Sequence, residues 1–531
     1  MESVEELISR QAEMKTERAR EEAQWRSIAE VFGPEAIDLD VHSKSTYDTS
    51  EIFDSTGLYA RDAFVGGIFG QLTNPSNRWL GLGLDDADLE AWPPVADWLQ
   101  RVSSRILGTA DVGSSQFYSQ VPAWLADLGM FGLGTGYSEK LPGGRYVDLA
   151  VPLGQTFIER DIYGSVTRLH REMMLTGRQL KRKFGPVERF EDKQSYVIVH
   201  AVRENDDFRP GRLGRNGMRW ASTYFAIGEK DWRRDGGYEE NPYFCVPWTE
   251  RAGRTYPVGP GHLARPDGQM LQEMERAHLV AAQRAAEPSV GMPEDSILTA
   301  ADFVPGRVLY GAVSPEGKPL AQPLSLAGDV RLSMAQSEQR RQAIRNAFYF
   351  GIMQLVDRPQ MTATEFLGFQ EEQLRLMAPN LAKIQSHGLS PWVARRYRIL
   401  ARENALPEMP KELDGARLRV EYQSPLAKMM EVAEGRATLQ IVDGVMRIMQ
   451  VDPAAGDNLD TDEAVRTLKA AFGGRTGLIR DPRVVAELRR QRAEQGAVDT
   501  EIDRTGRAVS IAAEAAHAAQ AQTLSEKRMV Q

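Results

Sequence analysis

The chain contains a single cysteine, Cys245, among its 531 residues. One thiol can form no internal disulfide and cannot supply a paired-cysteine zinc site, and this usage suits a reducing compartment. Long apolar runs are also missing, because the best one, Ala63–Leu72, is too short to cross a bilayer and contains three glycines. The N-terminus is charged from its second residue, unlike a secretory signal. We therefore expect no disulfide framework and no membrane-spanning segment.

Positive charge is in deficit as well. The 65 lysines and arginines are outnumbered by 74 aspartates and glutamates, which leaves a formal net charge of −9. This balance argues against a protein that wraps nucleic acid on a basic surface, but it suits one past which nucleic acid slides without sticking. The small basic clusters RQLKRKF and RRQAIR are each more typical of a solvated helix face than of a DNA site.

The motifs of catalysis are absent or incomplete. The sequence has no P-loop, no G-x-S-x-G and no H-x-x-x-H. GLGTG at Gly132–Gly136 lacks the full spacing of a phosphate-binding loop, so a tight turn is the preferred interpretation. The acidic runs Asp85–Asp88 and Asp457–Glu463 lack the glycine and final glutamate of a calcium loop, and favour a solvated loop and a helix N-terminus. We predict no cofactor, no metal site and no catalytic residue.

Hydrophobic periodicity predicts a mixed α+β chain that is mostly helical. Residues 2–30 form an amphipathic helix pattern that Gly33 and Pro34 end. Residues 145–250 alternate apolar and polar side chains and predict a β-rich region. A length of 531 residues exceeds a single core, so we expect several domains or one elaborated assembly subunit.

Two predicted helices flank a proline-rich segment in the second half of the chain. Asp267 is a candidate N-cap for the first helix, and Pro288 stops it. Residues 289–327 hold five prolines and short strand-like pieces, which predicts a compact insertion. The second helix, Asp329–Met353, is polar in its first half.

The sharpest local signal follows this second helix. Pro359 breaks the helix within QLVDRPQ, and MTATEF restarts it. Thr362 and Glu365 have the spacing of a capping box, in which each side chain bonds the amide of the other residue. Met361 and Phe366 have the spacing of a hydrophobic staple. Taken alone, this stretch favours an ordinary helix–loop–helix corner.

Several of these segments occur in the order found in a known family. FDSTGLYARDAFVGGIFGQLTNPSNRWLGL (Phe53–Leu82), TGRQLKRKFG, NPYFCVPW, YPVGPG, MTATEF and YQSPLA follow one another along the chain, and MTATEF is the most specific. Through most of its length the chain resembles the portal, or head-to-tail connecting, protein of short-tailed bacteriophages. One departure lies in YPVGPG, where Pro257 and Val258 stand where the family has an arginine, which puts the role of that arginine in doubt.

The resemblance implies a portal-type subunit in a ring, usually of twelve, at one capsid vertex, with a central channel for double-stranded DNA. Its implied parts are a wing (1–265 and 362–426), a first stem helix (266–287), a clip (288–327), a second stem helix (328–353), a tunnel loop (354–361) and a helical crown (427–531). The candidate DNA-facing residues of the tunnel loop are Gln354, Asp357, Arg358 and Gln360. Their contacts with DNA would be independent of its sequence.

The resemblance also implies partners and a location. The partners are identical subunits, the major capsid and scaffolding proteins, the terminase large subunit, a tail adaptor or tube protein, and DNA, with no membrane. The location is the capsid vertex of the virion, and the host cytoplasm during assembly. Two alternatives stay open here: a structural tail adaptor ring with no packaging role, and a multidomain enzyme with an unrecognised active site. The enzyme hypothesis predicts a deep pocket with converging, pKa-shifted groups.

Overall fold

The chain, described by a computed structural model, divides into two compact units. Unit 1 comprises Met1–Gly83, Leu99–Met409 and Arg417–Leu426, and unit 2 comprises Leu84–Trp98, Pro410–Ala416 and Ala427–Gln531. The structure describes residues 2–40, 49–111, 113–287, 289–292, 294, 298–299, 308–323, 330–353, 376–413, 415, 417–422, 425–450, 452, 454, 458–472, 484–492 and 511.

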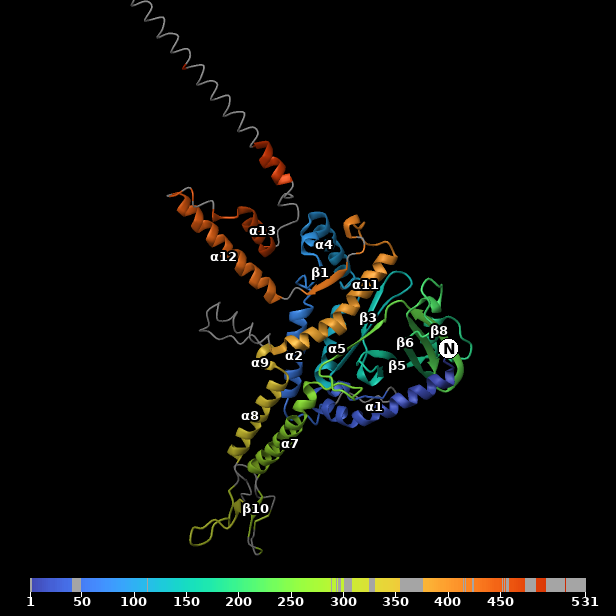
Figure 1. Cartoon of the computed structure of the whole chain (residues 1–531). Helices are drawn as coiled ribbons and strands as arrows, with labels where there is room; N and C mark the ends of the chain where they lie inside the picture. The colour runs from blue at the N-terminus through green and yellow to red at the C-terminus, as the bar shows by residue number, and fades with distance from the viewer. Residues whose placement is uncertain are drawn as a thin grey trace, which may run out of the picture. The chain divides into compact units, whose positions relative to one another are not determined.

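Helices and strands build unit 1, which confirms the mixed α+β fold class (Figure 1). The helices are α1 (Val4–Phe32), α2 (Thr56–Leu72), α5 (Phe117–Phe131), α6 (Gly177–Phe184), α7 (Pro260–Ala286), α8 (Val330–Ala347), α9 (Phe350–Met353) and α11 (Ser390–Arg402). The strands are β1 (Leu80–Leu84), β2 (Leu133–Lys140), β3 (Tyr146–Ala150), β4 (Thr156–Arg160), β5 (Val166–Thr176), β6 (Ser195–Glu204), β7 (Trp220–Ala226), β8 (Glu229–Tyr238), β9 (Tyr243–Pro247), β10 (Val290–Gly291), β11 (Gln322–Pro323) and β12 (Leu418–Tyr422). Helix α4 (Pro93–Gly108) is divided between the two units.

The larger sheet has the strand order β4-β5-β6-β7-β8 and buries both of its faces. On one face, Val199 and Ala201 of β6 pack against Leu7 of α1. On the other face, Ile198 packs in a cluster with Leu180 of α6. Successive residues of a strand point to opposite faces, so one apolar run serves both cores. The predicted β-rich region at 145–250 is therefore confirmed.

The smaller sheet has the order β3-β2-β9, and it explains the GLGTG motif. Gly132 ends α5 in the left-handed conformation, with φ 83°, and Leu133–Gly136 then form the start of β2. A side chain at Gly136 would meet the ring of Phe244 on the neighbouring strand β9. The motif is a helix cap followed by a strand that needs close packing, and β2 was missed from the sequence.

Helix α1 extends from the large sheet to the base of α7. Ser3 caps it in a capping box with Glu6, and it ends before Gly33, as predicted. In its middle, the buried Arg18 donates hydrogen bonds to the carbonyl oxygens of Leu39 (2.6 Å) and Gly154 (2.9 Å). These bonds fix two neighbouring loops to the helix, since a buried guanidinium must have its donors satisfied.

Helix α11 joins the later part of unit 1 to the small sheet. The buried Arg396 guanidinium lies 2.6 Å from the Asp148 carboxylate of β3, and Trp392 donates to the same carboxylate at 2.9 Å. A π-helical turn, η5 (Gln385–Leu389), runs directly into α11. The fully buried ion pair therefore connects residues 248 positions apart in the chain.

Two predicted helix boundaries differ from the structure. Helix α7 begins at Pro260 rather than at Asp267, because the fixed φ of proline suits the first helical position. The predicted helix Asp329–Met353 is two helices, since α8 ends at Ala347 and α9 begins at Phe350. Between α7 and α8, the described strands β10 and β11 form a short antiparallel pair.

Unit 2 contains helix α3 (Ala87–Ala91), the short helix η6 (Lys411–Leu413), most of α12 (Pro425–Met449) and α13 (Thr461–Phe472). The Asp86 carboxylate caps α3 by accepting from the amides of Asp88 and Leu89. Asp460 accepts from the amide of Asp462 at the start of α13, so the second acidic run lies at a helix N-terminus as predicted. Among the residues of either unit that the structure describes, no helix is long and apolar enough to cross a bilayer.

Candidate functional site

The site residues predicted from the sequence lie outside the described residues. The candidate loop residues are Gln354, Asp357, Arg358 and Gln360, and the cap residues are Met361, Thr362, Glu365 and Phe366. They stay predictions. The structure describes α7 and α8, the two helices that precede the predicted loop. It also describes the residues of unit 1 that hold these helices in place.

Helices α7 and α8 lie side by side and run in opposite directions, toward and away from the β10–β11 pair (Figure 1). Arg340 of α8 lies 2.8 Å from the Asp267 carboxylate of α7, and Arg341 lies 2.8 Å from that of Glu275. The RRQAIR cluster was interpreted as a solvated face, but these two arginines bridge the helices instead. Each partly exposed pair contributes about 0.2–1 kcal/mol, and together the two pairs set the register of the two helices.

Asp54, just before α2, joins both helices to the body. Its carboxylate lies 2.8 Å from Arg341 and accepts from the Thr56 amide. Gln272 of α7 accepts from the Asp54 amide at 2.9 Å and donates to its carbonyl at 2.7 Å. Burial raises the pKa of Asp54, but the hydrogen bonds from Thr56 and Arg341 outweigh it and lower the pKa. The carboxylate therefore stays ionised and paired at neutral pH.

Close backbone contact holds the base of α7. A Cβ atom at Gly259 would lie 2.6 Å from the nitrogen of Gly132, and one at Gly261 would lie 2.9 Å from the Cα of Met130. Val258 exchanges backbone hydrogen bonds with Thr249. The YPVGPG motif is therefore a backbone docking point for the helix, and its glycines allow the approach.

Within residues 334–347, the part of α8 whose side chains the structure describes, four exposed uncharged residues share one side of the helix, which was not predicted. Exposed side chains recur at positions 335, 339, 342 and 346, on the side of the helix opposite the buried Ser337 and Ile344. They are Ala335, Gln339, Gln342 and Asn346, called here the amide stripe. The spacing i, i+4, i+7, i+11 of uncharged residues was the available signal, but a face can be assigned only when the buried side is known.

The junction of α8 and α9 is a fixed bend. Tyr349 has φ 56°, and its ring centroid lies 5.9 Å from that of Trp248. The buried Phe348 packs against Phe32 with ring centroids 5.2 Å apart. Packing of two aromatic side chains outweighs the left-handed backbone, which costs a non-glycine residue about 1–2 kcal/mol. The chain thus changes direction just before the predicted loop.

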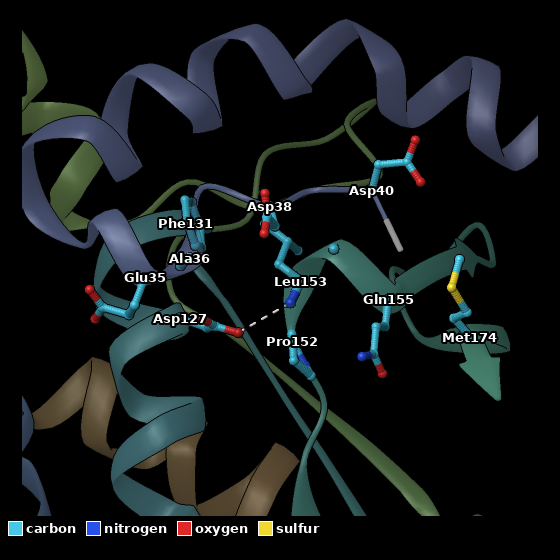
Figure 2. A pocket seen from close by; sticks show the side chains of 11 residues that line it. Glu35, Ala36, Asp38, Asp40, Asp127, Phe131, Pro152, Leu153, Gln155 and Met174 are labelled. Atoms are coloured by element: carbon cyan, nitrogen blue, oxygen red, sulfur yellow. Dashed lines mark hydrogen bonds between the residues drawn. The ribbon is translucent and has the colours of Figure 1, made fainter. Parts of the chain in front are cut away.

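A separate cavity of about 330 Å³ lies between the loop after α1 and the turn η2 (Leu153–Gln155) (Figure 2). Asp127 lines it, and burial raises the pKa of this carboxyl to about 7 even though the Leu153 amide donates to it. The other acidic residues of the lining are Glu35, Asp38 and Asp40, and the lining residues that the structure describes include no serine, cysteine, lysine or histidine. Carboxylates are thus the one kind of nucleophilic side chain among the described residues of its lining.

Metal binding finds no support in the described part of the chain, where no three histidine, cysteine, aspartate or glutamate side chains are arranged to hold an ion. The pocket that the enzyme hypothesis predicts would need converging groups of shifted pKa. The cavity supplies one such carboxyl, Asp127.

A family model and two relatives found by sequence indicate the same class of protein. The model of a family described as bacteriophage head to tail connecting protein matches residues 4–479. The chain is 26% identical over 511 residues to a portal protein of Salmonella phage epsilon15, covering 92% of this chain and 91% of that protein. It is 26% identical over 509 residues to a probable portal protein of Bordetella phage BPP-1, with the same coverage. A solved chain from the virion of a native gene transfer agent particle has a TM-score of 0.38 and 11% identity, covering 84% of this chain and 93% of that one.

Proposed function

Because the chain belongs to the family of bacteriophage head to tail connecting proteins, we propose that its copies close into a ring, usually of twelve, that conducts double-stranded DNA. The ring sits at one capsid vertex, where it joins head and tail, and it catalyses no reaction. The observation that carries this proposal is the family match across residues 4–479, supported by two portal proteins aligned over 92% of the chain.

The parts of the subunit take the roles that the resemblance implies. We assign α7 and α8 to the stem, residues 288–327 to the clip, residues 354–361 to the tunnel loop and residues 427–531 to the crown. A helix of 27 residues such as α7 spans about 40 Å, which is long enough to line a channel wall. The ion pairs of Arg340 and Arg341 support this role, since they keep the two helices in register.

The amide stripe of α8 is our candidate for the channel surface. Gln339, Gln342 and Asn346 can form hydrogen bonds with phosphate oxygens or water. They carry no positive charge that would bind the phosphate backbone of the DNA tightly. A moving duplex gains little from any one position on such a surface, because strong binding to phosphates depends on lysine and arginine. The tunnel-loop candidates Arg358 and Asp357 would add local contacts to this surface.

The partners follow from the same assignment. The clip, with Tyr310 exposed between β10 and β11, would dock the terminase large subunit during packaging and the tail adaptor or tube protein afterwards. The wing would face the major capsid and scaffolding proteins during assembly in the host cytoplasm.

Imaging of the purified protein tests the ring. We expect annular particles by negative-stain electron microscopy, and a monodisperse monomer or dimer under all assembly conditions would refute the proposal. Deleting the gene should leave empty shells, because packaging would fail. DNA-filled heads without tails would instead identify a tail adaptor with no packaging role.

Charge placed on the amide stripe tests the channel surface. The double variant Gln339→Lys/Gln342→Lys should keep its rings but package DNA several-fold more slowly, with the defect relieved by added salt. Gln116→Lys is the matched control, since it adds a lysine at an exposed position away from α8. Equal packaging rates for the double variant and the control would show that the amide stripe does not line the channel.

A further inference from the structure

Two turns at one end of the large sheet expose large apolar side chains. The turn between β4 and β5 exposes 90% of Ile162 and 86% of Tyr163, and the loop between β6 and β7 exposes 99% of Leu213. The two turns are neighbours, because β5 and β6 are antiparallel and Arg168 near the start of β5 lies opposite Arg203 near the end of β6 in the backbone register. Three exposed apolar side chains, those of Ile162, Tyr163 and Leu213, therefore lie at the same end of the sheet.

The first turn is held rigidly. The Asp161 carboxylate accepts from the amides of Tyr163 (2.9 Å) and Ser165 (2.8 Å), and Gly164 takes the left-handed conformation at φ 86°. The Arg160 side chain, at the end of β4, donates a hydrogen bond to the Gly164 carbonyl oxygen. A turn fixed in this way loses little conformational entropy on binding, so its exposed side chains are ready to bind a partner.

The second loop is held in a similar way and carries positive charge. The Asn205 side chain donates to the carbonyls of Arg215 (3.0 Å) and Met218 (2.8 Å), closing the loop at its base. Arg209 and Arg212 are exposed, and no described residue forms a side-chain hydrogen bond or ion pair with either guanidinium. We call Ile162, Tyr163, Arg209, Arg212 and Leu213 the sheet-end patch.

Helix α1 shows how far this patch lies from the stem. At its start, Glu2 pairs with Arg168 and Arg203, at the same end of the sheet as the patch. At its end, Phe32 packs against Phe348 at the foot of α8. A helix of 29 residues spans about 43 Å, so the patch lies roughly 40 Å from the base of the stem.

We infer that the sheet-end patch docks the ring to the protein shell of the head, at a surface with an apolar pocket and an acidic rim. The inference rests on the proposed function: if α7 and α8 surround the channel, the patch lies at the outer circumference of the ring. Isoleucine and tyrosine tips need apolar pockets, and the two arginines need carboxylates. DNA in the channel offers neither an apolar pocket nor a carboxylate, and it lies at the centre of the ring, away from the patch.

The test uses portal-deficient procapsids assembled from the shell and scaffolding proteins of the cognate phage. The full-length variant Ile162→Asp/Tyr163→Asp/Leu213→Asp should form normal rings but enter procapsids at least about tenfold less than the wild type, by quantitative mass spectrometry. Arg209→Glu/Arg212→Glu should also reduce incorporation, through charge repulsion. Leu376→Asp is the matched control, because Leu376 is 68% exposed in a different segment to which no binding role is assigned. It should be incorporated like the wild type.

Folding is checked separately, since side chains this exposed should change the melting temperature by no more than about 1 °C. Incorporation of the triple variant at the wild-type level would overturn the inference. So would loss of rings in the triple variant alone, because that would place the patch between subunits. Failure of the wild-type protein to form rings would instead refute the proposed function.

Discussion

Replacing Gly132 by alanine tests the backbone contact that holds the base of α7. Gly132 has φ 83°, and a Cβ atom there would lie 2.5 Å from the nitrogen of Gly259. The substitution therefore combines two costs, a left-handed conformation and a clash with backbone that has no free side chain to move. Two other glycines allow these costs to be measured one at a time.

Gly253 has φ 79° and an open surrounding, so Gly253→Ala carries the conformational cost alone. This cost is about 1–2 kcal/mol. Gly259 has φ −112°, which suits any residue, but its Cβ would lie 2.6 Å from the Gly132 nitrogen, so Gly259→Ala carries the steric cost alone. Forcing backbone apart by about 1 Å costs about 1–3 kcal/mol. Gly132→Ala carries both, or about 2–5 kcal/mol.

Thermal unfolding followed by circular dichroism measures the series, at one protein concentration because assembly shifts the apparent stability. At about 2–4 °C per kcal/mol, Gly253→Ala should lower the melting temperature by a few degrees and Gly132→Ala by roughly 4–20 °C. Gly259→Ala should fall between them. A melting temperature of Gly132→Ala equal to that of Gly253→Ala would refute the contact between these two backbones.

Three further outcomes follow from other residues. Arg396→Met should lower the free energy of unfolding by about 3–5 kcal/mol because it leaves the Asp148 carboxylate buried without its cation, and adding Asp148→Asn should recover much of this loss in denaturant titrations. The folded-state pKa of Asp127, about 7, exceeds its unfolded value, so its stabilising contribution is full below about pH 4 and is lost as the pH rises through 7. Asp127→Asn should thus melt like the wild type at pH 4 but be about 1–2 kcal/mol more stable at pH 8. Thr362→Ala and Glu365→Ala should each cost the predicted helix about 1 kcal/mol and reduce DNA packaging more than ring assembly, and wild-type packaging in both would return this stretch to an ordinary corner.

Much of the secondary structure could be predicted because its signals are local. Strands β5 and β6 alternate apolar and polar residues, and α6 lies between a threonine cap and Gly185, all within a few residues. The family, too, could be recognised from the order of short motifs. Strand β2 escaped because its first residues include Gly134 and Gly136, which oppose strand formation locally and are favoured only by the Trp124 and Phe244 side chains beside them.

The boundaries of α7 and α8 were predicted wrongly for a related reason. Asp267 has the chemistry of a helix cap, but in the folded chain its carboxylate pairs with Arg340, and the helix begins seven residues earlier. Nothing near Phe348 in the sequence breaks a helix. The break occurs where Phe348 fits between Phe32 and Phe64, a contact that exists only once α1 and α2 are in place.

The sequence by itself determined the class of protein, the absence of catalytic motifs and the two helices that flank a proline-rich segment. The tertiary structure alone decided which face of α8 is free and which arginines bridge its neighbours. The reason is physical, since the Arg341 guanidinium is neutralised by Glu275 and Asp54, which are 66 and 287 residues away. The hydrophobic pattern of a helix shows which residues share a face, but only long-range contacts decide which face packs on the protein and which stays exposed.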